Sequence, residues 1–100
     1  MFVRMSIMFE CHVFHSVYYQ SMTRSVLYEV VDRAEFCMRF LGYTVPGEAV
    51  VAGAESMLKK ERDSDRCEVL LGIVERVRVP YVGRVHSEAT IMLNQRMQSE

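Results

Sequence analysis

The sequence predicts an α+β fold, a small single domain over residues 1–100 with a long N-terminal strand, three amphipathic helices and a C-terminal β-hairpin. Three patterns predict it: alternating residues near the N-terminus, apolar stripes at helical spacing in the middle, and alternation about a proline near the C-terminus. Folding of 100 residues, half of them hydrophobic, would bury about 65% of the extended chain's surface, enough for one core. A mostly α fold with a residual hairpin is the alternative.

A period of two dominates the stretch from Val3 to Val13. Successive side chains of a strand point to opposite faces, so this alternation favours a half-buried β-strand. In a helix the polar members would be scattered around the axis. One face holds Val3, Met5, Ile7, Phe9, Cys11 and Val13, and the other holds Arg4, Ser6, Met8, Glu10 and His12.

After a polar break at 20–23, apolar residues recur at intervals of three and four between Val26 and Leu41. That spacing places them on one side of a helix. Gly42 stands where a left-handed residue would end the helix, and Pro46 adds a further stop. The stripe consists of Val26, Leu27, Val30, Val31, Ala34, Cys37, Met38 and Leu41.

Two further helices are predicted in the middle of the chain. The first opens at Pro46-Gly47 and carries an apolar stripe that ends at Leu58. The next follows the run 63–65, which offers an N-cap, and stops before Pro80. Its residues 69–74 could alternatively form a buried strand, because a short apolar run has no diagnostic period.

The C-terminal region is predicted to complete a three-stranded antiparallel sheet with the first strand. Apolar and basic residues alternate over 76–86 around a Pro-Tyr-Val-Gly bend, which indicates a hairpin at an edge or turn. The last stretch, 87–97, is interpreted as a strand through Leu93 with a frayed tail. A short helix with Ser87 as its N-cap is the alternative.

The net charge and the cysteine content argue against several classes of protein. A net charge of −1 at pH 7 leaves no overall field to attract nucleic acid or anionic lipid, so any basic site must be local. Three widely spaced cysteines argue against a disulfide framework and predict an intracellular, reducing compartment, the cytoplasm first. Charged residues interrupt the apolar N-terminus, so neither a membrane span nor a signal peptide is expected.

No arrangement of residues predicts a metal, a cofactor or a catalytic site. The run Cys11-His12-x-x-His15 contains soft ligands but lacks the second ligand pair of a structural zinc site. A cysteine nucleophile would need a base beside it, such as His86 or His15 next to Cys67 or Cys11. Because Cys67 lies on an apolar stripe, an inert thiol is expected. A small enzyme with its site at a subunit junction is the third functional alternative.

A local group of basic residues supports a second functional hypothesis, a nucleic-acid or ribonucleoprotein-binding domain. Arginines flank the predicted hairpin and an aromatic ring lies at its tip, which suits contacts to phosphates and stacking on a base. Acidic residues interleave with these cations, however, and edge strands often carry such charges to resist aggregation. The candidate residues are Arg76, Arg78, Tyr81 and Arg84.

The leading hypothesis is a non-catalytic protein–protein interaction module, either a homodimer or a small subunit of a larger intracellular assembly. On a helical wheel, Phe36 and Phe40 fall opposite the apolar stripe of the 26–41 helix, and two clustered aromatic residues indicate a second buried surface. Small domains often complete their cores by association. Burial of this helix inside the monomer is the alternative. The expected interface residues are Phe36, Phe40, Tyr43, Met22 and Phe14.

Overall fold

The computed structural model describes the backbone of residues 2–76 and 79–99, and the side chains of 17–76 and 79–99. These residues form four helices and contain no strand, so the predicted α+β class is wrong. The mostly α alternative has the right class of element, but its residual hairpin is absent from the described residues as well. The helices are α1 (Phe2–Phe40), α2 (Pro46–Leu58), α3 (Ser64–Glu75) and α4 (Pro80–Gln98).

The predicted N-terminal strand is wrong because its residues lie within α1. Neither glycine nor proline occurs between residues 2 and 41, so no backbone preference interrupts a helix there. The supposed break at 20–23 consists of residues that a helix accepts, among them the strong helix formers Gln20 and Met22. The alternation in 3–13 was therefore too short to exclude a helix.

The end of α1 and the whole of α2 follow the predictions. Gly42 has a φ of 79°, which confirms the left-handed residue after α1. The backbone N–H of Leu41 donates to the Cys37 carbonyl at 3.0 Å, so the last turn is closed. Pro46 occupies the first turn of α2, after an extended Val45. A proline suits that position because its fixed φ is helical and its missing N–H would have no partner there.

An aspartate starts α3, as predicted. The Asp63 carboxylate accepts hydrogen bonds from the backbone N–H groups of Asp65, at 2.8 Å, and Arg66, at 3.2 Å. These bonds satisfy two donors that have no partner within the helix. The alternative of a buried strand over 69–74 is wrong, because these residues lie inside α3.

The predicted hairpin over 76–86 is wrong in all of its described part. Arg76 ends α3 with a φ of 58°, and residues from Pro80 onward already belong to α4, while 77–78 lie outside the described residues. Pro80 initiates a helix here instead of ending a strand, again after an extended valine, Val79.

The predicted strand through Leu93 is wrong too, because α4 continues to Gln98. Ser87 is not an N-cap but an interior residue of α4, and its hydroxyl donates to the Gly83 carbonyl at 3.2 Å. A serine within a helix often makes this bond to the preceding turn.

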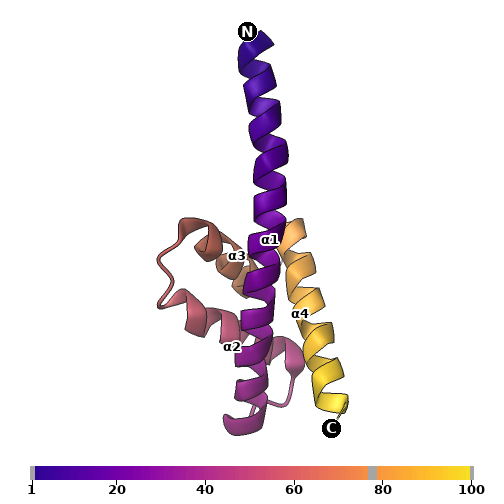
Figure 1. The fold of residues 1–100 in the computed structure, drawn as a ribbon. Helices are drawn as coiled ribbons and strands as arrows, with labels where there is room; N and C mark the ends of the chain where they lie inside the picture. The colour runs from indigo at the N-terminus through magenta and orange to yellow at the C-terminus, as the bar shows by residue number, and fades with distance from the viewer. Residues whose placement is uncertain (1, 77–78, 100) are drawn as a thin grey trace.

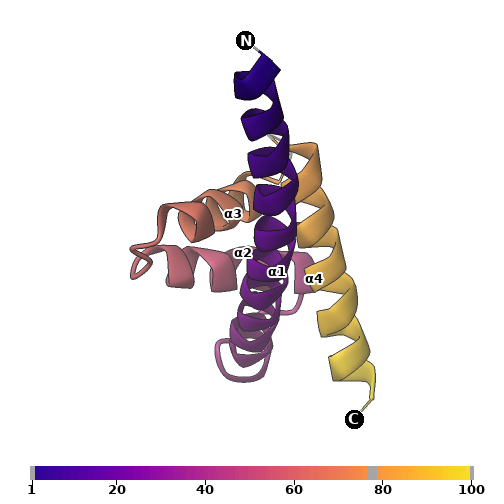
Figure 2. The same cartoon turned by 45° about the horizontal axis from the view of Figure 1, so that its top comes forward.

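The helix α4 lies along one side of α1 and α3 lies on the other, while α2 crosses α1 and begins beside α4 (Figures 1 and 2), where the His86 ring lies 3.3 Å from the Gly47 carbonyl. The α1 and α4 helices run parallel, since Tyr19 contacts Tyr81 at one end and Asp32 pairs with Arg96 at the other. The amino-terminal part of α1 extends beyond the other helices (Figure 1). Its 39 residues span about 58 Å at 1.5 Å per residue, which accounts for the 56 Å long axis of the molecule.

One core joins all four helices. Two glycines allow close contact between helices: a Cβ on Gly53 would lie 3.1 Å from the backbone N of Ala34, and one on Gly72 would lie 2.3 Å from Val82 Cγ1. The largest fully buried side chains are Leu70, Ile73, Leu93, Val26, Val30, Val31, Val50, Val69 and Val82.

Candidate protein interface

Four apolar residues form an exposed cluster around the carboxyl end of α1. The aromatic patch, as we call it, consists of Phe36, Phe40, Leu41 and Tyr43. Phe36 is 54% exposed and Phe40 is 71% exposed, although their rings pack together with centroids 5.1 Å apart. Their exposure contradicts burial of this side of the helix inside the monomer. Large apolar side chains clustered in this way are typical of a binding surface.

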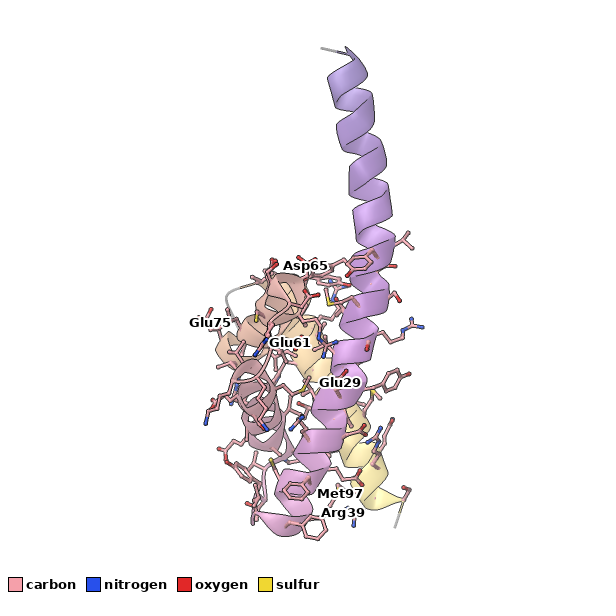
Figure 3. All side chains as sticks on the ribbon, turned by 60° about the vertical axis from the view of Figure 1, so that its left-hand side comes forward. Glu29, Arg39, Glu61, Asp65, Glu75 and Met97 are labelled. Carbon is pink, nitrogen blue, oxygen red and sulfur yellow. The ribbon has the colours of Figure 1, made fainter. Side chains whose placement is uncertain are left out.

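A groove beside the aromatic patch separates α1 from α2. It is open, has a volume of about 600 Å³, and is lined by Phe36, Leu41 and Tyr43 on one side and by Ala52 and Ser56 of α2 on the other. Figure 3 labels Arg39 and Met97 at this end of the molecule, where α1 and α4 both terminate. The patch and the groove thus form one continuous surface at the end of the bundle.

The structure brings three of the five predicted interface residues together. Phe36, Phe40 and Tyr43 belong to the aromatic patch, whereas Met22 lies in the core and is only 9% exposed. Met22 precedes Val26 by one turn, so it continues the buried stripe of α1. Phe14 is part of α1, but its side chain lies outside the described residues.

Charged residues around the patch are paired within the chain. Arg96 of α4 donates to Asp32 at 2.5 Å and to Glu35 at 3.4 Å, and Arg39 donates to Glu35 at 3.1 Å. The hydrogen bond to Asp32 is the main reason that the pKa of Arg96 is raised above its ordinary value. Arg33 donates to Ser56 Oγ across the groove at 3.4 Å. The rim of the patch therefore offers few unpaired charges.

A second ion cluster, which the sequence did not reveal, joins three segments through Arg66. Its guanidinium donates to Glu29 of α1 at 2.8 Å and also pairs with Glu61, which precedes α3. Figure 3 labels Glu29 on α1 and Glu61 in the segment before α3. Arg66 and Glu29 are 37 residues apart, so the spacing of charges along the sequence does not predict that they pair.

The predicted nucleic-acid residues are only partly brought together. Arg76 is exposed at the end of α3, Arg84 is exposed on α4, and Arg78 lies outside the described residues. The Tyr81 ring packs against Tyr19, with centroids 5.6 Å apart, which covers part of the face that would stack on a base. Burial is the main reason that the pKa of Tyr19 is raised. The basic hairpin itself does not exist in the described residues.

The cysteines and histidines assemble no catalytic pair among the described residues. Cys37 is buried, and this burial raises the pKa of its thiol, which disfavours the nucleophilic thiolate. Cys67 donates to the Glu61 carbonyl at 3.6 Å, and the His86 ring lies 3.3 Å from the Gly47 carbonyl. Within the described residues no group of three His, Cys, Asp or Glu side chains could hold a metal ion. The side chains of Cys11, His12 and His15 are outside that set.

Comparison with known proteins gives no relative: no family model, no curated protein and no solved structure matches the chain significantly. In the part of the chain that the structure describes, no helix combines the length and the apolar character needed to cross a membrane. The aromatic patch therefore has to be interpreted from its own chemistry.

Proposed function

We propose that this chain is a non-catalytic protein–protein interaction domain that forms a homodimer through the aromatic patch. The observation that carries the proposal is the joint exposure of Phe36 and Phe40, which contact each other yet remain open to solvent. Aromatic residues are enriched at the centres of interfaces, where they contribute most of the binding free energy. The free thiols Cys37 and Cys67 support the further proposal of a reducing, intracellular setting.

The patch supplies most of the area that a specific dimer needs. At 150–250 Å² for each aromatic side chain, its four residues expose about 400 Å² of apolar surface. Two patches face to face would remove about 800 Å², and a polar rim would raise this above the roughly 1,000 Å² that a specific interface requires. A patch of about 400 Å² lies within the roughly 300–600 Å² of the largest patch on a typical monomer, and such patches are often functional.

The charges around the patch favour a second copy of the same chain. A two-fold interface places each patch against itself, so unpaired like charges would repel. Here Asp32 and Glu35 are already paired with Arg96 and Arg39, so two rims can meet without such repulsion. A strongly charged partner, by contrast, would find little complementary charge.

The test is the mass of the protein in solution, measured by light scattering after size exclusion over a hundredfold range of concentration. We expect a dimer for the unmodified chain and a monomer for Phe36→Asp/Phe40→Asp. Removing two central aromatic residues should weaken association more than about a hundredfold. Circular dichroism checks that the double variant keeps its helices.

Ile91→Asp is the matched control, because Ile91 is also a large exposed apolar residue but lies on α4. It should leave the dimer unchanged. A monomer at every concentration would overturn the proposed dimer, as would a dimer that survives the double substitution. Unfolding of the double variant would assign both rings to the core and overturn the proposal too.

The other two functional hypotheses have less support in the described residues than the dimer has. The nucleic-acid hypothesis required a basic hairpin, and the described residues of that segment are helical. The enzyme hypothesis placed Cys67 or Cys11 beside His86 or His15. The Cys67 thiol donates to the Glu61 carbonyl and the His86 ring lies against the Gly47 carbonyl, while the side chains of Cys11 and His15 lie outside the described residues. No observation in the described residues favours either of them over the dimer.

A further inference from the structure

The groove between α1 and α2 opens beside the aromatic patch, and its wall on the α2 side consists of small residues. Ala52 and Ser56 form that wall, and Phe36, Leu41 and Tyr43 line the opposite side. The volume of the groove is about 600 Å³. Sites for small molecules have roughly 300–1,000 Å³, so one aromatic ring from outside the molecule fits into this groove.

The charged residues that line the groove already have partners within the chain. Glu29 and Asp32 are paired with arginines of α3 and α4. Arg33 donates to Ser56 Oγ across the groove at 3.4 Å. A charged ligand would compete with these bonds, whereas an uncharged ring can pack on the apolar walls and leave them in place. The groove therefore favours an apolar occupant.

The Phe40 side chain stands beside the groove without lining it. It is 71% exposed, more than any other large hydrophobic side chain of the described residues. Its ring packs on the ring of Phe36, which does line the groove, with centroids 5.1 Å apart. Each molecule thus carries a projecting ring directly next to a groove that has room for one.

This neighbouring of ring and groove suits a two-fold dimer. In such a dimer every contact occurs twice, so a ring that enters the groove of the other copy is matched by the reverse contact. Two flat patches would bury only about 800 Å², below the roughly 1,000 Å² of a specific interface. Reciprocal insertion of two rings also buries the walls of both grooves, and it therefore supplies the area that flat contact lacks.

We infer that the groove between α1 and α2 binds the Phe40 ring of a second copy of the chain, and that the two copies insert these rings reciprocally. The inference rests on the proposed dimer and adds the contact that aligns its two copies. Phe40 of one copy packs between Phe36 and Ala52 of the other. Aromatic side chains that fill a pocket of the partner contribute much of the binding free energy of an interface.

The test uses two variants that each lack one half of this contact. Phe40→Ala removes the ring and keeps the groove, whereas Ala52→Trp keeps the ring and fills the groove. Each variant alone should dimerise about a hundredfold more weakly than the unmodified chain, because both insertions are lost. Light scattering after size exclusion measures the dimerisation, and circular dichroism checks that both variants keep their helices.

An equimolar mixture of the two variants is the decisive sample. The mixed dimer should form about tenfold more tightly than either homodimer, since the ring of one chain meets the open groove of the other and restores one of the two insertions. Native mass spectrometry separates the three dimers by mass. Flat contact between the patches would give the mixed dimer an affinity between those of the two homodimers, so an excess of mixed dimer is specific to insertion.

Glu55→Trp is the matched control, because Glu55 is an exposed residue of α2 that does not line the groove. It should dimerise as the unmodified chain does and give no excess of mixed dimer with Phe40→Ala. Ser56→Trp fills the groove from the next turn of α2 and should repeat the result of Ala52→Trp. It keeps the inference testable if the Ala52 position does not accept the larger side chain.

Two results would overturn the inference and leave the proposed dimer standing: a dimeric unmodified chain whose variants give no excess of mixed dimer, or equal effects of Glu55→Trp and Ala52→Trp. A monomeric unmodified chain would instead overturn the proposed dimer itself, and the inference with it.

Discussion

Glycine is required where the fold brings backbones close together. A Cβ on Gly72 of α3 would lie 2.3 Å from Val82 Cγ1, and one on Gly83 of α4 would lie 2.6 Å from the Arg76 carbonyl. Real Cβ atoms essentially never approach so closely. The contact between α3 and α4 therefore depends on two missing side chains, one on each helix.

Gly72→Ala tests this contact, because two effects of opposite sign compete there. Alanine is a better helix former than glycine by about 1 kcal/mol, yet the new methyl group would overlap Val82. Overpacking of a core commonly costs about 1–3 kcal/mol, so we expect a net decrease in the free energy of unfolding, measured in urea.

Val82→Ala in the Gly72→Ala background serves as the control for that prediction. The smaller side chain should remove the overlap, so the double variant should be more stable than the sum of the single effects implies. Strict additivity, or stabilisation by Gly72→Ala alone, would contradict the close contact.

The Cys37 thiol makes stability depend on pH. Burial raises its pKa, so the folded state holds the proton more tightly than the unfolded state, whose cysteine titrates near 8.5. As the pH rises through that value, the unfolded state loses its proton first and the free energy of unfolding falls. We expect urea unfolding at pH 7, 8.5 and 10 to show this decrease, and Cys37→Ala to make it shallower. An unchanged slope in the variant would contradict the argument.

At the scale of helices, start signals determine the fold more than periodicity does. Both α2 and α4 begin with a proline after an extended valine, at Val45-Pro46 and at Val79-Pro80. The residue before a proline avoids the helical region, and the proline itself suits a first turn. The Val-Pro dipeptide thus begins a helix at both places, although the sequence analysis predicted a helix start at Pro46 and a bend at Pro80.

The Asp63 carboxylate is the side-chain cap of α3, and its removal isolates the contribution of that cap. Asp63→Ala should lower the free energy of unfolding by about 0.5–2 kcal/mol, because two backbone N–H groups lose their acceptor. Asp63→Asn keeps an acceptor oxygen and should retain most of the stability. Thermal unfolding of the three proteins compares them, and equal losses in both variants would rule out the cap as the cause.

The middle of the chain could be predicted from sequence, whereas its two ends could not. The stripe from Val26 to Leu41, the cap at Gly42 and the cap at Asp63 are local features with a definite spacing. The N-terminal residues 3–13 fit two periods over a short range, and only the lack of glycine and proline argued for a helix. The alternation after Arg76 misled because Pro80 begins a helix.

A candidate site could be predicted from the sequence where its residues lie close together along the chain. Phe36 and Phe40 are one helical turn apart, so a wheel placed both on one exposed side. Met22 lies too near the core stripe for a wheel to separate it from that stripe.

At the scale of the whole molecule, two arginines form ion pairs that join α3 and α4 to α1. Arg66 links α3 to Glu29, and Arg96 links α4 to Asp32. The Arg66 side chain is 20% exposed and that of Arg96 is 34% exposed, so solvent screens the second pair more. Both links hold together segments that are distant in the sequence.

Replacement of each arginine by methionine compares the two links. Arg66→Met should lower the free energy of unfolding by about 1 kcal/mol, since it leaves the partly buried Glu61 and the more exposed Glu29 without their partner. Arg96→Met should cost about 0.5 kcal/mol, as is usual for an exposed pair. Urea unfolding in low and high salt measures both, and the Arg96 effect should shrink more in high salt. A larger loss for Arg96→Met would contradict the order.

The parallel packing of α1 against α4 has a consequence for how the chain folds as it is made. Asp32 and Arg96 are 64 residues apart, so their helices meet only after α2 and α3 have been synthesised. Until then the core residues of α1, among them Val26 and Val30, lack the part of the core that α4 supplies. Contacts between distant segments form slowly, and uncovered apolar surface attracts other chains. We therefore expect a nascent chain that stops before α4 to need a chaperone, whereas one that includes α4 can close its own core.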